Sequence, residues 1–338
     1  MSFVLAKRNL GGKQAMTLTK LNLSLAIIAL ALILFMPLLV NAGLLYLVGA
    51  TLILAVYAVG WNLLFSWAGL ASFGSGGLFT IGAYVTAVAL NAGWGAHYLA
   101  VLLLAGLIGG LIAGLVALVA LRRTSGIFLA ILTLSLAELL RHILMKTRSL
   151  GSEDGIAGII RPEINLGLVS INLNAGHNFY FFICIIGALI VALCWWLAHG
   201  PFGRAMLATR HDIDRAGFVG INAYMTRVVA FAISGVISAL AGALYAPWAQ
   251  IVTPELAGML KSTQPILFTL LGGIHSFWGP VIGAFTFMVI DYATRTLIGI
   301  QEIITGAILL GVILMFRSGI AGGWNALWKR LLAFNGGK

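Results

Sequence analysis

Few residues in this chain are of types that perform chemistry. Of its 338 residues, 61% are hydrophobic and 9% are Asp, Glu, Lys or Arg, whereas soluble domains carry about 25% charged residues. Cys184 and Cys194 lie ten residues apart in one apolar run, which as a helix separates them by about 15 Å, too far for a disulfide. The six histidines show no metal-ligand spacing. We therefore expect no catalytic site, no metal site and no disulfide.

Charge gathers instead in one stretch, "GPFGRAMLATRHDIDRAGFVGINAYMTR" at residues 200–227, which carries six charged side chains between two apolar runs. Wound as a helix, residues 202–216 separate most charged side chains from an apolar face made of Phe202, Ala205, Met206, Thr209, Ile213 and Ala216. Such a helix could lie among lipid headgroups or dock into a groove of a soluble partner. The pattern alone leaves both readings open.

Ten apolar runs predict an integral membrane protein that crosses the bilayer repeatedly. They lie at residues 21–40, 44–65, 66–90, 98–121, 126–143, 179–198, 228–249, 262–276, 280–297 and 300–316. A spanning helix needs about 20 apolar residues, so 262–276 is short. The first run resembles a secretory signal, but it is longer than the usual core of about 7–15 residues, and we expect an uncleaved membrane helix.

The basic residues set the predicted orientation. Ten spans with a cytoplasmic N-terminus place fourteen of the twenty Lys and Arg residues inside, whereas merging 262–297 into one span nearly removes this bias. The net charge of +11 then reads as a topology signal, and no nucleic-acid partner is expected. The predicted parts are a cytoplasmic tail at 1–20, a transmembrane domain at 21–316 with a periplasmic segment at 146–178 and a cytoplasmic loop at 200–227, and a second cytoplasmic tail at 317–338.

Two clusters among the 42 glycines suggest a transport path. In lipid, small residues let helices pack closely, or let a helix break where it lines a cavity. The clusters fall in the third and eighth runs, which cross in opposite directions, and such pairs are typical of inverted-repeat transporters. Tight packing is the alternative for any single glycine. The residues expected along the path are Gly69, Ser72, Gly74, Ser75, Gly272 and Gly273.

Several motifs follow one another between residues 45 and 320: "NLLFSWAGLASFGSGGLFTIGAY", "GIFLAILTLSLAELLR", "LGSEDGI", "GPFGRAMLATRHDIDRAGFVGINAYMTRVVAFAISGVISALAGALYA" and "LLGGIHSFWGPVIGAF". Together they resemble the inner-membrane permease subunits of branched-chain amino acid (Liv-type) ABC importers. Three places depart from the family pattern: Ser75 replaces a common histidine, His275 a usual glycine, and residues 211–213 a segment that is acidic and amide-rich.

The resemblance implies an all-α polytopic fold of about ten transmembrane helices with an inverted-repeat core, like that of the vitamin B12 importer class. It also implies that the loop at 200–227 couples to an ATPase, through Phe202, Gly203, Arg204, Met206, Arg210, Ile213 and Gly220. No G-x-x-x-x-G-K-[ST] sequence occurs, so ATP and Mg would bind separate subunits and this chain would hold no cofactor. The implied partners are a second homologous permease, two cytoplasmic ATP-binding subunits, a periplasmic substrate-binding protein and membrane lipid.

The main alternative is an ion-coupled secondary transporter, which also uses inverted repeats but would want a carboxylate at mid-membrane. No run centres on one; Glu138 with Arg141 and Asp291 with Arg295 have helical pair spacing near predicted outer ends. We expect these to be structural pairs, although guidance of a zwitterionic substrate or docking of the binding protein stays open. The expected location is a bacterial inner membrane, with both termini cytoplasmic. The substrate is open among branched-chain and other neutral amino acids, amides, urea and aromatic acids.

Overall fold

The computed structural model describes residues 36–37, 40–124, 126–165, 170–174, 177–295, 300–315, 319–320 and 322. The chain divides into two units, Met1–Tyr46 and Leu47–Lys338. The apolar run expected at 21–40 and the two predicted tails therefore lie almost wholly outside the described residues.

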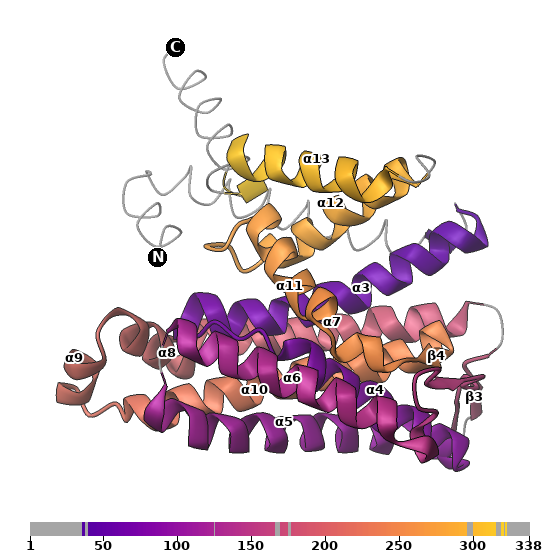
Figure 1. Ribbon diagram of the computed structural model, residues 1–338, viewed down its shortest axis with the longest axis horizontal. Coiled ribbons are helices and arrows are strands. Elements are labelled where there is room, and N and C mark those ends of the chain that lie inside the picture. The colour runs from indigo at the N-terminus through magenta and orange to yellow at the C-terminus, as the bar shows by residue number, and fades with distance from the viewer. Residues whose placement is uncertain are drawn as a thin grey trace. The chain divides into compact units, whose positions relative to one another are not determined.

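Helices make up most of the described chain (Figure 1). The long helix α3 (Ala42–Asn62) continues into a five-residue π-helix, η1 (Leu63–Trp67). The following helices are α4 (Ser75–Asn91), η2 (Trp94–His97), α5 (Tyr98–Arg123), α6 (Ile127–Lys146), η3 (Arg148–Leu150), α7 (Asn178–His199), α8 (Pro201–His211), α9 (Ile213–Phe218), α10 (Ala223–Ala249), η4 (Pro254–Ala257), α11 (Met259–Gly272), α12 (Gly279–Thr294) and α13 (Gln301–Met315).

Five helical segments among the described residues are long and apolar enough to cross a membrane: Ala42–Trp67, Trp94–Arg123, Ile127–Lys146, Asn178–His199 and Ala223–Ala249. Each coincides with one of the apolar runs found in the sequence, which confirms a multi-helix membrane protein. Two shorter apolar helices, Ser75–Asn91 and Gly279–Thr294, overlap two further runs. The total of ten spans, the inverted repeat and the vitamin B12 importer class stay predictions.

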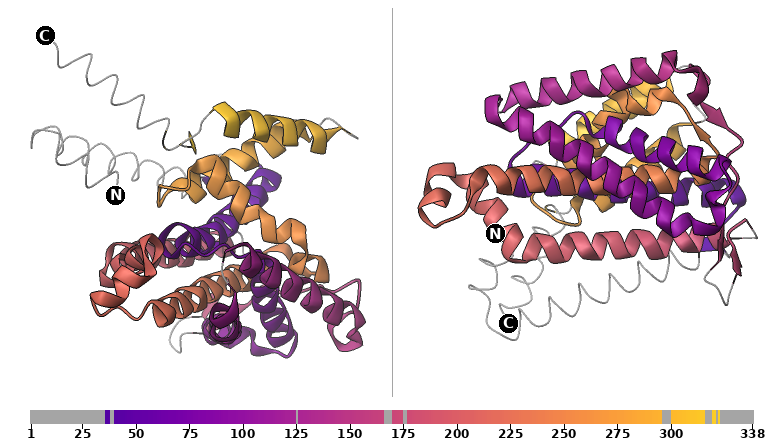
Figure 2. Two further views of the ribbon diagram at one scale, coloured as in Figure 1. Left: turned by 60° about the vertical axis from the view of Figure 1, so that its left-hand side comes forward. Right: turned by 90° about the horizontal axis from the view of Figure 1, so that it is seen from below.

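Small residues let α10 pack closely against both α4 and α5, beside which it lies in Figures 1 and 2. A Cβ added to Gly109 of α5 would collide with the Cβ of Ala239 in α10. One added to Gly82 of α4 would collide with the Ala239 carbonyl, and one added to Gly242 of α10 with the Phe79 carbonyl. Since lipid gives little hydrophobic drive for helix association, this close backbone contact supplies much of the packing energy.

Among the described residues, four short strands correct the purely helical prediction. β1 (Ile156–Ala157) pairs antiparallel with β4 (Ile251–Val252), and β2 (Glu163–Asn165) pairs antiparallel with β3 (Ser170–Asn172). Three of them belong to the segment expected to be periplasmic. Open strand edges are excluded from the hydrocarbon region, so we expect this part of the chain to lie outside it.

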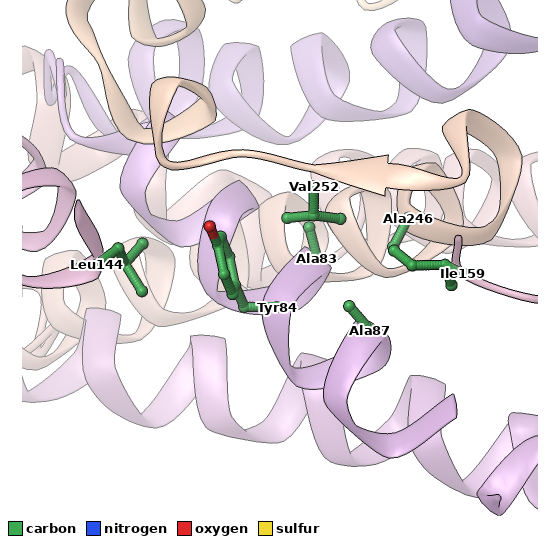
Figure 3. Close-up of a cluster of buried hydrophobic side chains, with 7 residues drawn as sticks. All are labelled: Ala83, Tyr84, Ala87, Leu144, Ile159, Ala246 and Val252. Atoms are coloured by element: carbon green, nitrogen blue, oxygen red, sulfur yellow. The ribbon is translucent and has the colours of Figure 1, made fainter. Parts of the chain in front are cut away.

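A buried apolar cluster attaches this stranded region to the helices (Figure 3). α4 supplies Ala83, Tyr84 and Ala87, and the ends of α6 and α10 supply Leu144 and Ala246. Ile159, in the segment after β1, and Val252 of β4 complete the cluster. The stranded region and the α8–α9 loop lie at opposite ends of the second unit in Figure 1. The helices between them thus separate two different surfaces.

Candidate functional site

The first glycine cluster interrupts a helix. The π-helix η1 ends at Trp67, Ala68 is still helical and α4 begins at Ser75, so residues 69–74 are not helical and the run predicted at 66–90 is not one continuous helix. Gly69 has a φ of +71°, in the left-handed region that favours glycine. Neighbouring side chains bond the freed backbone, since Trp61 Nε1 donates to the Ser72 carbonyl at 2.7 Å.

The second glycine cluster makes the turn between α11 and α12. Gly273 has a φ of +115°, and a Cβ added to Gly272 would collide with the Gly279 carbonyl. Only glycine permits this approach of the two backbones. At 14 residues, α11 is shorter than the roughly 20 residues that a spanning helix needs. The run expected at 262–276 is therefore a shorter helix followed by a tight turn.

Two buried polar side chains connect the two clusters. Ser66 Oγ, in η1, lies 2.5 Å from Asn62 Oδ1 and 2.6 Å from the carbonyl oxygen of Ile274 in the second turn. Asn62 Nδ2 donates to the carbonyl of Ser276 at 3.3 Å. Because polar groups in a membrane interior must find partners, these bonds fix η1 against the turn at 273–278.

The start of α4 is held against α3 and α11. The Tyr57 hydroxyl donates to Ser75 Oγ at 2.8 Å, and the Gly76 N–H donates to Ser262 Oγ at 3.2 Å. A Cβ added to Gly74 would lie 2.5 Å from the Thr133 carbonyl of α6. Of the expected path residues, Ser72, Ser75, Gly272 and Gly273 are buried, Gly74 is half-buried and Gly69 is exposed; their place along a path stays a prediction.

The charged stretch forms two helices, which corrects the single helix expected over 202–216. Asp212 is extended, with φ −161° and ψ 114°, and it separates α8 from α9. Its Oδ1 accepts the backbone N–H groups of Asp214 and Arg215, each at 3.1 Å, and its Oδ2 pairs with Arg215 Nε at 2.8 Å. Asp212 is therefore the N-cap of α9, a role in which aspartate competes with continuation of the preceding helix.

The break changes which apolar side chains are exposed. Met206, expected as a surface anchor, is 0% exposed and packs inside the chain. Ile213 is 47% exposed, whereas Phe218 and Val219, absent from the expected contacts, are 91% and 80% exposed. We call Ile213, Phe218 and Val219 the apolar tip. The signal in the sequence was the pair of large apolar residues between glycines in "GFVG".

The other expected coupling residues divide between the surface and the interior. Arg204 and Gly220 are exposed, and Phe202 is half-buried. Gly203 is buried, and it lies so close to the end of α7 that an added Cβ would collide with the Ala198 carbonyl. Beside the apolar tip, a shallow groove of about 440 Å³ is lined by Ala208, His211, Asp212, Arg215, Ala216, Val219 and Ile221.

Arg210 joins the loop to the first glycine cluster. Its Nη1 donates to the main-chain carbonyl of Ser66, and a Cβ added to Gly69 would lie 2.8 Å from Arg210 Cγ. Arg210 therefore contacts η1 and the residues that follow it. Ser66 thus contacts both α8, through its carbonyl, and the turn between α11 and α12, through its hydroxyl.

The two predicted ion pairs are present. Arg141 Nε lies 2.7 Å from Glu138 Oε2, and Arg295 Nη2 lies 3.0 Å from Asp291 Oδ2. Arg141 Nη1 also pairs with Glu255 of η4 at 2.8 Å, and Glu138 Oε1 accepts the Met259 N–H that begins α11. The first pair thus ties α6 to η4 and α11, a structural role.

Within the part of the chain that the structure describes, no group of three His, Cys, Asp or Glu residues could hold a metal ion. Cys184 and Cys194 are both free and buried.

Comparison with known proteins identifies the family. A family model described as "Branched-chain amino acid transport system / permease component" matches residues 43–316. The chain is 29% identical over 269 residues to the high-affinity branched-chain amino acid transport system permease protein LivM of Salmonella typhimurium, covering 73% of this chain and 63% of that protein. It is 28% identical over 274 residues to LivM of Escherichia coli (strain K12), covering 75% and 64%.

A shorter match, 31% identical over 134 residues, links it to the autoinducer 2 import system permease protein LsrC of Yersinia pseudotuberculosis serotype O:1b, covering 37% of this chain and 38% of that protein. No solved structure matches. The matched region spans less than two thirds of the length of the two LivM proteins. With its apolar helices, the chain is an integral inner-membrane transport protein, and it belongs to the permease component family of branched-chain amino acid transport systems.

Proposed function

We propose that this chain is the membrane-spanning subunit of an ABC importer, forming half of a path for branched-chain or related neutral amino acids. The longer similarity is to proteins named as branched-chain amino acid permeases, whereas the similarity to the autoinducer 2 permease covers 37% of the chain. The reported relatives are named as permease proteins of a transport system or an import system. These names favour an importer over the ion-coupled carrier considered above.

The observation that carries the proposal is the apolar tip. It stands on a polar loop between two apolar helices long enough to span, α7 and α10. Large exposed apolar side chains with polar residues around them mark a contact with a protein or a membrane. We assign the tip and its groove to a cytoplasmic ATP-binding subunit, with Arg204 and Gly220 at the rim. Met206 and Gly203 seat α8 on the chain itself.

Arg210 gives this contact a route into the membrane domain. When ATP binding draws the two ATPase subunits together, the α8–α9 loop moves with its partner. The Arg210 contact to Ser66 then displaces η1, and the Ser66 contact to Ile274 displaces the second glycine turn. The glycine breaks at Gly69, Ser72, Gly74, Ser75, Gly272 and Gly273 would open and close the path between the two sides of the membrane.

The rest of the assembly follows the same proposal. A second homologous permease completes the path, two ATPase subunits bind ATP and Mg, and a periplasmic protein delivers the substrate to the surface formed by 146–178. This chain holds no cofactor of its own, lies among membrane lipid and binds no nucleic acid. Both tails, 1–20 and 317–338, would be cytoplasmic, flanking a membrane domain at 21–316.

The test is co-purification of the ATPase subunit with Phe218→Asp. Burying a phenylalanine contributes about 1.5–3 kcal/mol, so a charge at this position should weaken binding about tenfold or more and stop ATP-driven uptake. Ile160→Asp is the matched control, because Ile160 is also exposed, at 72%, but lies on the stranded region. It should leave ATPase binding unchanged. A Phe218→Asp complex that keeps its ATPase and its uptake would refute the assignment.

A further inference from the structure

Lys261, the third residue of α11, is buried where three helices meet. It is 9% exposed. Its Nζ lies 4.9 Å from the ring centroid of Phe79 in α4 and 5.0 Å from that of Tyr245 in α10. The two ring centroids are 5.4 Å apart, so the ammonium lies beside a pair of aromatic rings inside a membrane protein, a place where an uncharged side chain of similar length would be far easier to accommodate.

No carboxylate of the described residues balances this charge, since none lies within 4.0 Å of Lys261 Nζ. Two carboxylates lie near the start of α11, Glu138 of α6 and Glu255 of η4. Both are bound to Arg141, and Glu138 also accepts the Met259 N–H. Cation–π contacts recover only part of the free energy of removing an ammonium from water. The ammonium form of Lys261 therefore has no carboxylate partner among the described residues.

The surroundings of Lys261 belong to the proposed path. The Tyr57 hydroxyl lies 3.3 Å from the Lys261 carbonyl and donates to Ser75 at the first glycine break. The next residue, Ser262, accepts the N–H of Gly76. Lys261 is thus attached to the same residues that we assign to opening and closing the path.

We propose that Lys261 binds the carboxylate of an α-amino acid during its passage, an inference that rests on the proposed function. The Phe79 and Tyr245 rings hold the ammonium while the path is empty. A passing carboxylate replaces these contacts with an ion pair, and the rings compete for the ammonium again as the substrate leaves. Because the rings offer this alternative, binding is weak enough for release. The recognised group is the carboxylate, so an amino acid amide should not be bound.

The first test measures ATP-driven uptake of L-leucine by the full importer complex in proteoliposomes. Lys261→Met keeps the length of the side chain without the charge, and it should lower uptake about tenfold or more, the loss of one charged hydrogen bond. ATPase binding and hydrolysis should persist. Lys261→Arg should restore most of the uptake, and Lys146→Met, at an exposed lysine of α6, should change nothing. Wild-type uptake by Lys261→Met would overturn the proposal, as would loss of uptake together with ATP hydrolysis in both Lys261 variants.

The second test needs no ATP. Millimolar L-leucine should raise the melting temperature of the purified wild-type and Lys146→Met complexes but not that of Lys261→Met, and L-leucinamide should raise none of them. Equal shifts with the two compounds, a shift retained by Lys261→Met, or no shift in the wild type would overturn the proposal. Failure of the proposed function looks different: the wild-type complex would then not couple ATP hydrolysis to L-leucine uptake, whatever the melting temperatures show.

Discussion

Ala239 of α10 is contacted by two glycines in different ways, which makes the packing of α4, α5 and α10 testable. A Cβ added to Gly82 of α4 would meet the Ala239 backbone, with its carbonyl carbon at 2.5 Å and its Cα at 2.6 Å. A Cβ added to Gly109 of α5 would instead meet the Ala239 Cβ, with the next atoms being the Gly235 oxygen at 3.1 Å and the Ala239 Cα at 3.7 Å. Removing the Ala239 methyl group should therefore relieve one clash and not the other.

The expected magnitudes follow from these atoms. Replacing glycine by alanine favours a helix by up to about 1 kcal/mol, but overpacking costs about 1–3 kcal/mol. The cost of Gly82→Ala should be at or beyond the upper end of this range, about 3 kcal/mol, because two backbones must separate. Gly109→Ala should cost about 1–2 kcal/mol. Ala239→Gly alone should cost about 0.5–1 kcal/mol through chain entropy.

The assay is the free energy of unfolding of the purified permease, measured for both double-mutant cycles. Gly109→Ala with Ala239→Gly should show a favourable coupling of about 1–2 kcal/mol, whereas Gly82→Ala with Ala239→Gly should be additive within about 0.5 kcal/mol. Gly114→Ala is the control, since its Cβ would lie at an ordinary 3.5 Å from Ala232 Cβ. Rescue of Gly82→Ala by Ala239→Gly would refute the backbone contact described for α4 and α10, and absence of rescue for Gly109→Ala would refute the contact with the Ala239 Cβ described for α5 and α10.

Three further predictions concern the loop, the orientation and the link between the glycine breaks. Asp212→Ala removes the N-cap of α9, a loss of about 0.5–2 kcal/mol, and should weaken ATPase co-purification severalfold, while Asp212→Asn keeps most of it. A cysteine replacing Asp154 should react with an impermeant thiol reagent in intact cells and one replacing Gly217 only after lysis; the opposite pattern would reverse the topology. Ser66→Ala should lower uptake per ATP hydrolysed without releasing the ATPase, whereas Ser135→Ala, whose hydroxyl bonds only within α6, should leave that ratio unchanged.

The apolar runs predicted the spanning helices well because hydrocarbon length constrains them directly. Each of the five spanning segments lies within a few residues of a run read from the sequence. The strands could not be predicted in the same way. Ile156 pairs with Val252, nearly a hundred residues later, and strands of two or three residues depend on such distant partners more than on their own composition.

The glycine breaks were also visible in the sequence, since positive φ and backbone contact both require glycine. The orientation of the α8–α9 loop was not. A helical wheel over 202–216 assumes one continuous helix, but Asp212 ends α8 and restarts the chain as α9. The wheel therefore grouped Met206 with Ile213, although one is fully buried and the other exposed. Which face of a short amphipathic helix is covered depends on the surface beneath it, and this information lies elsewhere in the chain.

Arg141 and Lys261 show why counting charges in apolar runs does not by itself find a binding site. Helical spacing made Glu138 and Arg141 conspicuous, and the structure surrounds Arg141 with two carboxylates, so its charge is balanced and it holds α6 against α11. Lys261 drew no notice because it precedes a short run and has no neighbour at pair spacing. In the fold it faces two aromatic rings and no carboxylate of the described residues. A cation that is paired with carboxylates, such as Arg141, stabilises the packing of helices. A cation without a carboxylate partner, such as Lys261, can bind the carboxylate of a substrate and release it again.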